Sequence, residues 1–272
     1  MPLTPEEFSL WQTLLKDMAG IHLDEKKAYL LVSRLSPLLN VYGFDNLMAL
    51  YAEAQKDWND SLPAEIVQVM TTHETNFFRH PPSYAFFAEL LRAKQRLQAT
   101  GRPLKILSAG CSTGEEPWSL AMTAWETLGA PAEDLVRIHA WDIAPTTLRL
   151  AREGVYRNLE KKVDAERINR YFQPVDNGMR VVDSLRPLVH FEVRNLLEPG
   201  TLGARFDIVF CKNVAIYFDP PTRKEFFDEL IAWMVPEGTL IVGSGESLVG
   251  VTQSFRRERH DQITVYRPVH RT

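Results

Sequence analysis

The stretch from Ser108 to Trp118 combines two glycines with two adjacent acids, and these residue types suit a nucleoside that carries positive charge. Gly110 and Gly114 allow the backbone to turn sharply and to approach a ligand closely, which a Cβ would prevent. A phosphate needs free N–H donors at the start of the next helix, whereas Glu115 and Glu116 repel phosphate and attract a cation. The chemistry favours S-adenosylmethionine over NAD or ATP. An ordinary turn between a strand and a helix explains this stretch, taken alone, about as well.

The flanking residues put this stretch between a strand and a helix. The apolar run 104–107 is typical of a buried parallel strand, and residues 117–122 open a helix that tolerates Pro117 in its first turn. Later segments continue the alternation, with strands expected at 104–109, 135–141, 206–211 and 238–243, and helices at 116–128, 146–153 and 221–234. This rhythm predicts an α/β fold with a Rossmann-like, doubly wound sheet.

Two segments depart from the alternation. Three short strand-like runs lie within about 170–194, where Asn177-Gly178 is a type I′ hairpin signal, so we expect a small antiparallel β insertion there. The runs at 254–258 and 262–266 suit an antiparallel hairpin that closes the sheet.

Residues 1–80 carry helical patterns only, so we expect an N-terminal helical domain there and the α/β domain over 81–272. Thr4 and Glu7 form a capping-box pattern before a first helix that ends at Gly20.

Further helices follow in this part of the chain. Asp24 is the expected N-cap of a second helix, which Pro37 should break or kink. The residues of this helix expected to face inward are Tyr29, Leu31, Val32, Leu35 and Leu38. Other helices are expected at about 45–57, 62–72 and 82–100.

The composition is that of an ordinary globular chain, with 272 residues of which 45% are hydrophobic and 24% charged. No apolar run approaches the ~20 residues that span a bilayer, and the acidic start of the chain is unlike a secretory signal. We therefore expect a cytoplasmic protein that is not embedded in a membrane. The net charge is −4 and residues 1–80 carry −5, so the chain lacks the basic stripe that nucleic-acid binding requires.

Cysteine and histidine chemistry is not expected. Cys111 and Cys211 are the only cysteines, and both end apolar runs, which is typical of buried free thiols. The histidines, of which His73 and His80 are the closest pair, lack the spacing of metal ligands, so we expect no metal site.

A series of ordered motifs resembles one family. They are Thr72–Arg79, Ser108–Trp118, Asp142, Asn195–Leu197 and Phe206–Asp219. Over nearly its whole length the chain resembles the chemotaxis-receptor glutamate O-methyltransferases of the CheR type. The resemblance implies a class I SAM-dependent methyltransferase that transfers a methyl group to receptor glutamates and releases S-adenosylhomocysteine.

The resemblance also implies a set of cofactor-binding residues. Asp142 would hold the ribose hydroxyls with its two acceptor oxygens, although it could instead cap the helix that begins at Ala144-Pro145. His73 stands where the family usually has Asn, and Lys212 replaces an Arg and so lacks a bidentate fork. The implied positions are His73, Thr75, Arg79, Gly110, Ser112, Gly114, Glu115, Glu116, Asp142, Asn195, Leu196, Lys212 and Asn213, with Glu115 or Glu116 facing the methionyl end.

The implied reaction needs no general base. A glutamate of pKa about 4.3 is already an anion at neutral pH, so catalysis reduces to positioning, desolvation and electrostatics. Arg79 is expected to orient this carboxylate and Tyr217 to line the transfer site with a hydrogen-bonding hydroxyl. Phe77 and Phe78 are expected to pack in the core and fix Arg79.

The expected partner is the set of cytoplasmic methylation helices of a chemoreceptor, recognised in part by the N-terminal domain. Lys26, Lys27 and Arg34 suit a docking role and a solvated helix face equally well. The segment 173–179, between the first two strands of the expected insertion, is short, and Pro174 removes a backbone donor that an added peptide strand would need. Capture of a C-terminal receptor pentapeptide is therefore not expected. We expect a monomer.

Two other functions fit parts of these observations. One is a non-catalytic signalling adaptor that binds the cofactor, which the presence of Arg79, Asp142 and Tyr217 disfavours. The other is a methyltransferase that acts on another protein or on a small-molecule carboxylate. Enzymes that methylate base amino groups would carry Asn/Asp-Pro-Pro-aromatic where this chain has residues 213–217, which are Asn-Val-Ala-Ile-Tyr.

Overall fold

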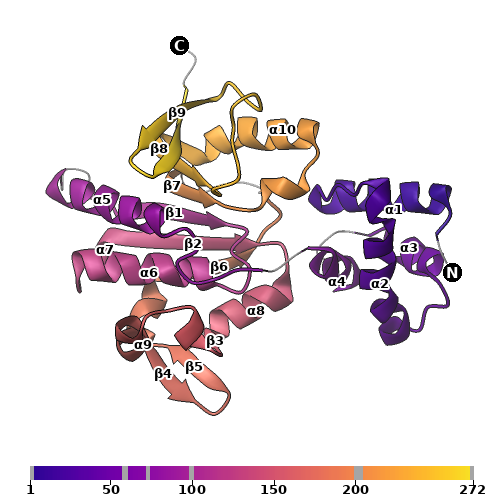
Figure 1. Cartoon of the computed structure of the whole chain (residues 1–272), viewed down its shortest axis with the longest axis horizontal. Coiled ribbons are helices and arrows are strands. Elements are labelled where there is room, and N and C mark those ends of the chain that lie inside the picture. The colour runs from indigo at the N-terminus through magenta and orange to yellow at the C-terminus, as the bar shows by residue number, and fades with distance from the viewer. Residues whose placement is uncertain (1–2, 57–60, 72–73, 98–100, 199–204, 270–272) are drawn as a thin grey trace.

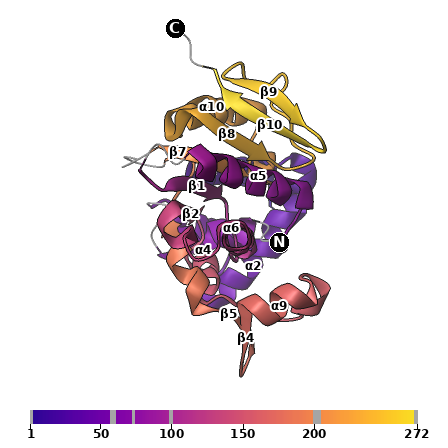
Figure 2. The same ribbon diagram turned by 90° about the vertical axis from the view of Figure 1, so that its left-hand side faces the viewer.

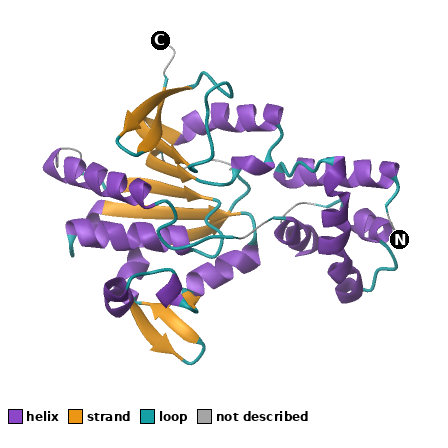
Figure 3. Ribbon diagram, in the orientation of Figure 1, coloured by secondary structure: helices purple, strands orange, loops and turns teal. Residues whose placement is uncertain are grey.

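The computed structural model describes residues 3–56, 61–71, 74–97, 101–198 and 205–269. The first part of the chain is helical, as Figure 3 shows, and Figure 1 places these helices opposite the ends of the central strands. They are α1 (Pro5–Ala19), the 3-10 turn η1 (Glu25–Lys27), α2 (Ala28–Tyr42), α3 (Leu47–Ala54) and α4 (Ser61–Met70). No helix in the described residues is long and apolar enough to cross a bilayer.

These helices enclose a core of their own. The side chains buried there include Trp11, Leu15, Leu31, Leu35, Leu50 and Ile66. The capping box of α1 is confirmed, because the side chains of Thr4 and Glu7 bond to each other's backbone N–H, and Gly20 ends the helix at φ 68°.

The second helix differs from expectation in three respects. Asp24 precedes η1 and makes no side-chain capping bond. The helix runs through Pro37 to Tyr42, so a break at this residue is wrong, whereas a kink stays a prediction. Leu35 and Leu38 are buried on both sides of the proline. Tyr29 is 67% exposed and does not face inward.

Arg34 does not point freely into solvent. Its Nη1 donates hydrogen bonds to the carbonyl oxygens of Met70 at 2.5 Å and Thr71 at 3.4 Å. Met70 is the last residue of α4 and Thr71 follows it, at a helix end where carbonyls lack partners within the helix. Arg34 therefore ties α2 to α4.

A seven-stranded sheet forms the second part of the chain. Its order is β6 (Val189–Val193), β2 (Val136–Asp142), β1 (Leu104–Ala109), β7 (Phe206–Cys211), β8 (Met234–Val242), β10 (Ile263–Pro268) and β9 (Phe255–His260). The first five strands in this order are parallel, and β10 and β9 form the expected antiparallel hairpin. The doubly wound sheet is confirmed.

Helices cover both faces of this sheet. Buried side chains of α5 (Pro81–Leu97), α6 (Glu115–Leu128) and α8 (Pro145–Glu153) share one core with Ile106 and Ile138, and those of α10 (Pro220–Leu230) share the other with Leu107 and Val209. The shorter helical elements are α7 (Ala132–Leu135), η2 (Leu159–Lys161), α9 (Ala165–Tyr171), η3 (Asp183–Leu188), η4 (Ala215–Tyr217) and η5 (Ile231–Trp233).

The expected insertion at 170–194 is correct only in part. A small antiparallel sheet of order β3 (Val155–Tyr156), β5 (Gly178–Val181), β4 (Phe172–Val175) projects from the main body, as Figures 1 and 2 show. The third run became β6, which pairs in parallel with β2 in the main sheet. In this position the ring of Phe191 packs against Trp118 of α6, and the two ring centroids lie 5.4 Å apart.

The winding direction of the sheet changes at β1, which lies between β2 and β7. The segments that leave the carboxyl ends of β1 and β7 therefore diverge, and open α/β sheets bind ligands in the crevice at this point.

Candidate active site

Two adjoining pockets lie at the carboxyl ends of β1, β2 and β7. The Asp142 pocket is lined by Ala19, Ile21, Thr71, Gly110, Ser112, Asp142, Ile143, Asn195, Leu196, Asn213, Val214, Tyr217 and Phe218. The Arg79 pocket is lined by Glu74, Thr75, Asn76, Arg79, Gly110, Cys111, Ser112, Glu116, Lys212, Asn213, Ile216 and Tyr217.

The turn after β1 brings backbone close to both pockets. Gly110, Ser112 and Gly114 have φ values of 69°, 51° and 93° in the left-handed region. The N–H group of Gly110 donates to the carbonyl oxygen of Trp141 at 2.8 Å, which ties the turn to β2. A Cβ on Gly110 would lie 2.3 Å from Cγ2 of Val214, so only glycine fits between the two loops.

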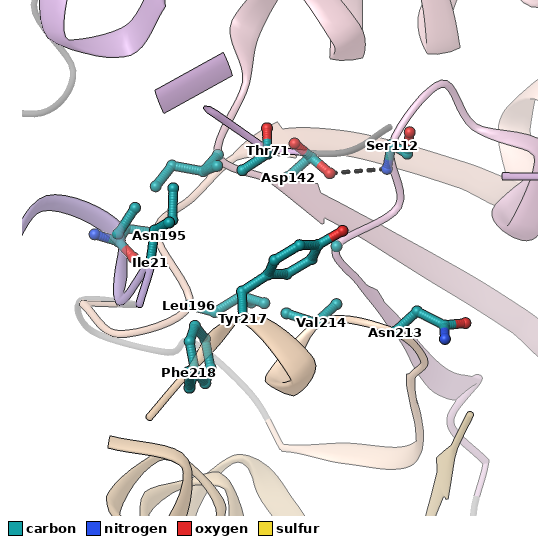
Figure 4. A pocket seen from close by; sticks show the side chains of 13 residues that line it. Ile21, Thr71, Ser112, Asp142, Asn195, Leu196, Asn213, Val214, Tyr217 and Phe218 are labelled. Carbon is teal, nitrogen blue, oxygen red and sulfur yellow. Dashed lines mark hydrogen bonds between the residues drawn. The ribbon is translucent and has the colours of Figure 1, made fainter. Parts of the chain in front are cut away.

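Asp142 ends β2 and is 7% exposed. Its Oδ2 accepts a hydrogen bond from the N–H of Ser112 at 2.8 Å, and its Oδ1 accepts one from the N–H of Ala144 at 3.0 Å. The first of these bonds is drawn in Figure 4. The carboxylate thus holds the turn after β1 and the start of α8 while it lines the pocket, and each carboxylate oxygen can accept more than one hydrogen bond.

The two acids at the start of α6 have different surroundings. Glu116 accepts a hydrogen bond from the hydroxyl of Ser108 at 2.8 Å and forms an ion pair with Lys212, whose Nζ lies 2.9 Å from Oε2. Glu115 is 4% exposed and accepts from the hydroxyl of Thr113 at 2.6 Å. Of the two acids, Glu116 lines the Arg79 pocket, and Glu115 lines neither of the two pockets described above.

Arg79 is held through its backbone. Phe77 is 4% exposed, with its ring 4.8 Å from that of Tyr156, and the N–H of Phe78 donates to Ser119 Oγ at 3.0 Å. Lys212 Nζ donates to the carbonyl oxygen of Arg79 at 3.0 Å. Arg79 is exposed as a residue and lines its pocket, where its Nη1 donates a hydrogen bond to the carbonyl oxygen of Glu74 at 3.2 Å. The anchoring by Phe77 agrees with expectation, whereas Phe78 is only partly buried.

Tyr217 lines both pockets from η4, in the loop after β7. Figure 4 shows its ring in the middle of the site, with the hydroxyl directed toward the segment that carries Ser112. Its carbonyl oxygen accepts a hydrogen bond from the N–H of His22 at 2.8 Å. The loop is therefore attached to the N-terminal helices.

Asn195 also joins the two parts of the chain. It is 2% exposed, and its Nδ2 donates to the carbonyl oxygen of Met18 at 2.9 Å while its Oδ1 accepts from the N–H of Leu197 at 3.1 Å. Residues of the N-terminal helical region complete the wall of the Asp142 pocket, namely Ala19, Ile21 and Thr71. Sequence reasoning missed them, because small and apolar residues beside a helix end look like ordinary core.

Both cysteines are buried free thiols, as expected. Burial raises the pKa of the Cys111 and Cys211 thiols well above the usual range, so both stay protonated. Among the described residues, no group of three His, Cys, Asp or Glu side chains could hold a metal ion.

Most of the expected site residues come together. Those that line a pocket are Thr75, Arg79, Gly110, Ser112, Glu116, Asp142, Asn195, Leu196, Lys212, Asn213 and Tyr217. Gly114 and Glu115 do not line either pocket, and His73 lies outside the described residues. Ligand contacts for all of these residues stay predictions.

Comparisons with known proteins identify the family. Residues 6–71 match the all-alpha domain and residues 73–264 the SAM binding domain of CheR methyltransferases. The chain is 35% identical over 270 residues to the chemotaxis protein methyltransferase of Vibrio parahaemolyticus, covering 97% of this chain and 98% of that protein. It is 36% identical over 275 residues to chemotaxis protein methyltransferase 2 of Pseudomonas aeruginosa, covering 97% and 94%. The chain belongs to the CheR methyltransferase family and is a SAM-dependent methyltransferase.

Proposed function

We propose that this protein transfers a methyl group from S-adenosylmethionine to glutamate side chains in the cytoplasmic helices of a chemotaxis-type receptor. The products are glutamate methyl esters and S-adenosylhomocysteine. The relatives named chemotaxis protein methyltransferases support this substrate class.

One observation carries the proposal, namely that the two pockets share a wall. Gly110, Ser112, Asn213 and Tyr217 line both. A nucleoside in the Asp142 pocket would thus lie next to a carboxylate attracted into the Arg79 pocket. Tyr217 stands between the two, where methyl transfer must occur.

The residues present fit the cofactor. Asp142 is a buried acceptor at the end of β2, and its carboxylate suits a pair of ribose hydroxyls. At Gly110 the backbone itself lines the pocket, because a side chain at this position would collide with Val214. Leu196, Ile143 and Val214 offer apolar surface for a base. These features support the use of the Asp142 pocket for the nucleoside.

The chemistry follows from charge. S-adenosylmethionine supplies a methyl group on a positively charged sulfur; the C–S bond breaks, a C–O bond forms, and sulfonium and carboxylate become a neutral thioether and a neutral ester. Arg79 attracts and orients the carboxylate, and Tyr217 donates a hydrogen bond at the transfer site. No residue needs to remove a proton, because the glutamate is already ionised at neutral pH.

We also propose that this enzyme acts in the cytoplasm as a monomer and without a peptide tether. In the three-stranded sheet β4 is an edge strand, and Pro174 within it lacks an N–H donor. A peptide added beside β4 could therefore not pair along its whole length. Titration with C-terminal receptor peptides checks this: micromolar binding that vanishes when residues 173–179 are altered would contradict it.

Methyl transfer from labelled cofactor tests the function. Purified protein is incubated with receptor-bearing membranes, with receptor-free membranes and with small carboxylates. We expect base-labile label in the receptor band only, and label that accumulates about 100-fold more slowly with Arg79→Ala. Label in small carboxylates alone would favour a small-molecule enzyme, and cofactor binding without any transfer would favour an adaptor.

A further inference from the structure

We propose that Glu246 is a positioning residue for methyl transfer, because its carboxylate fixes the loop that carries Asn213 and Tyr217. Glu246 does not line either pocket and lies in the turn after β8. The inference rests on the proposed function, since it concerns how the same site keeps its shape.

One carboxylate oxygen of Glu246 joins two loops. Its Oε2 accepts hydrogen bonds from the N–H groups of Asn213 at 2.7 Å and Gly243 at 2.8 Å. These residues follow the neighbouring parallel strands β7 and β8, which end side by side at the paired residues Cys211 and Val242. An ionised acceptor makes such bonds shorter and stronger than a neutral one.

The bond to Asn213 lies where the loop turns. Asn213 has a φ of 62°, a left-handed conformation that asparagine adopts more often than most residues with a side chain. The chain direction set there leads through Val214 into η4 and Tyr217. At the end of this loop the carbonyl oxygen of Tyr217 accepts a hydrogen bond from the N–H of His22. At its start the N–H of Asn213 is held by Glu246.

The free-energy cost of burying the Glu246 carboxylate also indicates that it is a positioning residue. The residue is 8% exposed, and its Oε1 is buried with no hydrogen-bond partner among the described residues. Burial raises the pKa of this carboxyl, while the bonds from Asn213 and Gly243 and the charges of Arg223 and Arg79 oppose the rise. A surface glutamate would avoid this desolvation, so the burial makes sense where two backbone N–H groups need an acceptor.

Gly243 is matched to this carboxylate. A Cβ at Gly243 would lie 2.5 Å from Oε2 of Glu246 and 3.3 Å from Nδ2 of Asn213. Its φ is outside the left-handed region, so an alanine there would avoid left-handed backbone strain and would act through its close contacts, of which that with the Glu246 carboxylate is the shortest. Gly245, two residues later, has nothing within 4 Å of a Cβ and provides a matched control.

Two substitutions at Glu246 separate the effect of side-chain length from that of side-chain charge. Glu246→Asp keeps the charge but withdraws the oxygen by one methylene, and Glu246→Gln keeps an acceptor in place without the charge. We expect Glu246→Asp to weaken S-adenosylhomocysteine binding in calorimetry by about tenfold and to lower kcat, because buried N–H groups lose their acceptor. Glu246→Gln should bind within about threefold of the parent, since neutral acceptors retain about half the bond strength.

The glycine pair gives an independent test. Gly243→Ala should weaken binding as Glu246→Asp does, and Gly245→Ala should leave it unchanged. Parental affinity in both Glu246→Asp and Gly243→Ala would overturn the proposal, as would a loss in Glu246→Gln equal to that in Glu246→Asp. Because the readout is cofactor-product binding, it decides the role of Glu246 even if receptors prove not to be the substrate.

Discussion

The backbone N–H of His22 donates a 2.8 Å hydrogen bond to the carbonyl oxygen of Tyr217, which joins the N-terminal helices to the loop with the proposed catalytic tyrosine. Asn195 makes a second connection through the carbonyl oxygen of Met18. The N-terminal helices thus help to shape the pocket, in addition to the receptor-recognition role proposed for them.

A third connection, between Lys16 and Asp219, predicts a pH dependence. The hydrogen bond from Lys16, followed by that from Thr222, lowers the pKa of Asp219 from 3.8 to about 2. A carboxyl whose pKa is lower in the folded state stabilises that state above its unfolded pKa and loses this effect as the pH falls through the folded value. Asp219→Asn keeps an oxygen to cap α10 at Thr222 but loses the ion pair with Lys16.

We therefore expect Asp219→Asn to unfold at a lower temperature than the parent above about pH 4, with the difference vanishing toward about pH 2. Thermal melts across this range measure it. Glu153→Gln, which removes an exposed partner of Arg149, should change little and serves as control. A difference between Asp219→Asn and the parent that stays constant with pH would remove the ion pair as its cause.

The role of Asp142 in cofactor binding predicts a large loss of affinity. Asp142→Ala should weaken S-adenosylhomocysteine binding in calorimetry by roughly 10- to 150-fold, equivalent to about 1.5–3 kcal/mol for a lost buried acceptor. Asp183→Ala, which changes an aspartate whose side chain is 72% exposed, should bind as the parent does. Equal affinity of Asp142→Ala and the parent would exclude Asp142 from the site.

Arg79 and Tyr217 should affect transfer more than binding. Arg79→Ala and Tyr217→Phe each remove a donor at the transfer site, so we expect kcat/KM to fall by about 100-fold. Their affinity for S-adenosylhomocysteine should stay close to that of the parent. Tyr29→Phe, on an exposed residue of α2, is the matched control for the lost hydroxyl. Unchanged turnover in both site variants would refute their assignment.

Alanine substitutions at Gly110 and Gly43, two glycines of similar conformation, should differ in their effect on cofactor binding. Gly110 and Gly43 have φ values of 69° and 73°, so alanine at either position should cost about 1 kcal/mol of stability. Only at Gly110 would the new Cβ meet Val214, whereas nothing lies within 4 Å at Gly43. Gly110→Ala should therefore weaken cofactor binding by about tenfold or more. If both variants bind alike, close approach at Gly110 is not required.

The parallel core of the fold could be predicted from the sequence because its strands are buried on both faces. β1 and β7 have the expected bounds, since each is a mostly apolar run that ends at a polar or glycine-containing turn. β6 was assigned to the wrong sheet, because the alternation of Val189, Phe191 and Val193 indicates a strand without naming its partner.

The candidate site could be predicted only where residue type reveals the chemistry. The glycine turn and Asp142 do so, whereas Ile21 and Thr71 resemble ordinary helix-flanking residues. Glu246 could not be found either, because its value lies in accepting two N–H groups from loops that only the sheet brings together. For the same reason Arg34 looked like a surface cation, since its partners follow α4, another helix.

The central claim is methyl transfer to receptor glutamates, and mapping the modified atoms tests it most directly. Purified receptor is incubated with the protein and S-adenosylmethionine, digested, and analysed by tandem mass spectrometry, with Arg79→Ala as the matched variant of low activity. We predict methyl esters on glutamate side chains of the cytoplasmic helices with the parent protein, and about 100-fold slower formation of the same esters with Arg79→Ala. Methyl groups on nitrogen or sulfur, or an unmodified receptor under conditions where the parent protein binds the cofactor, would contradict the account.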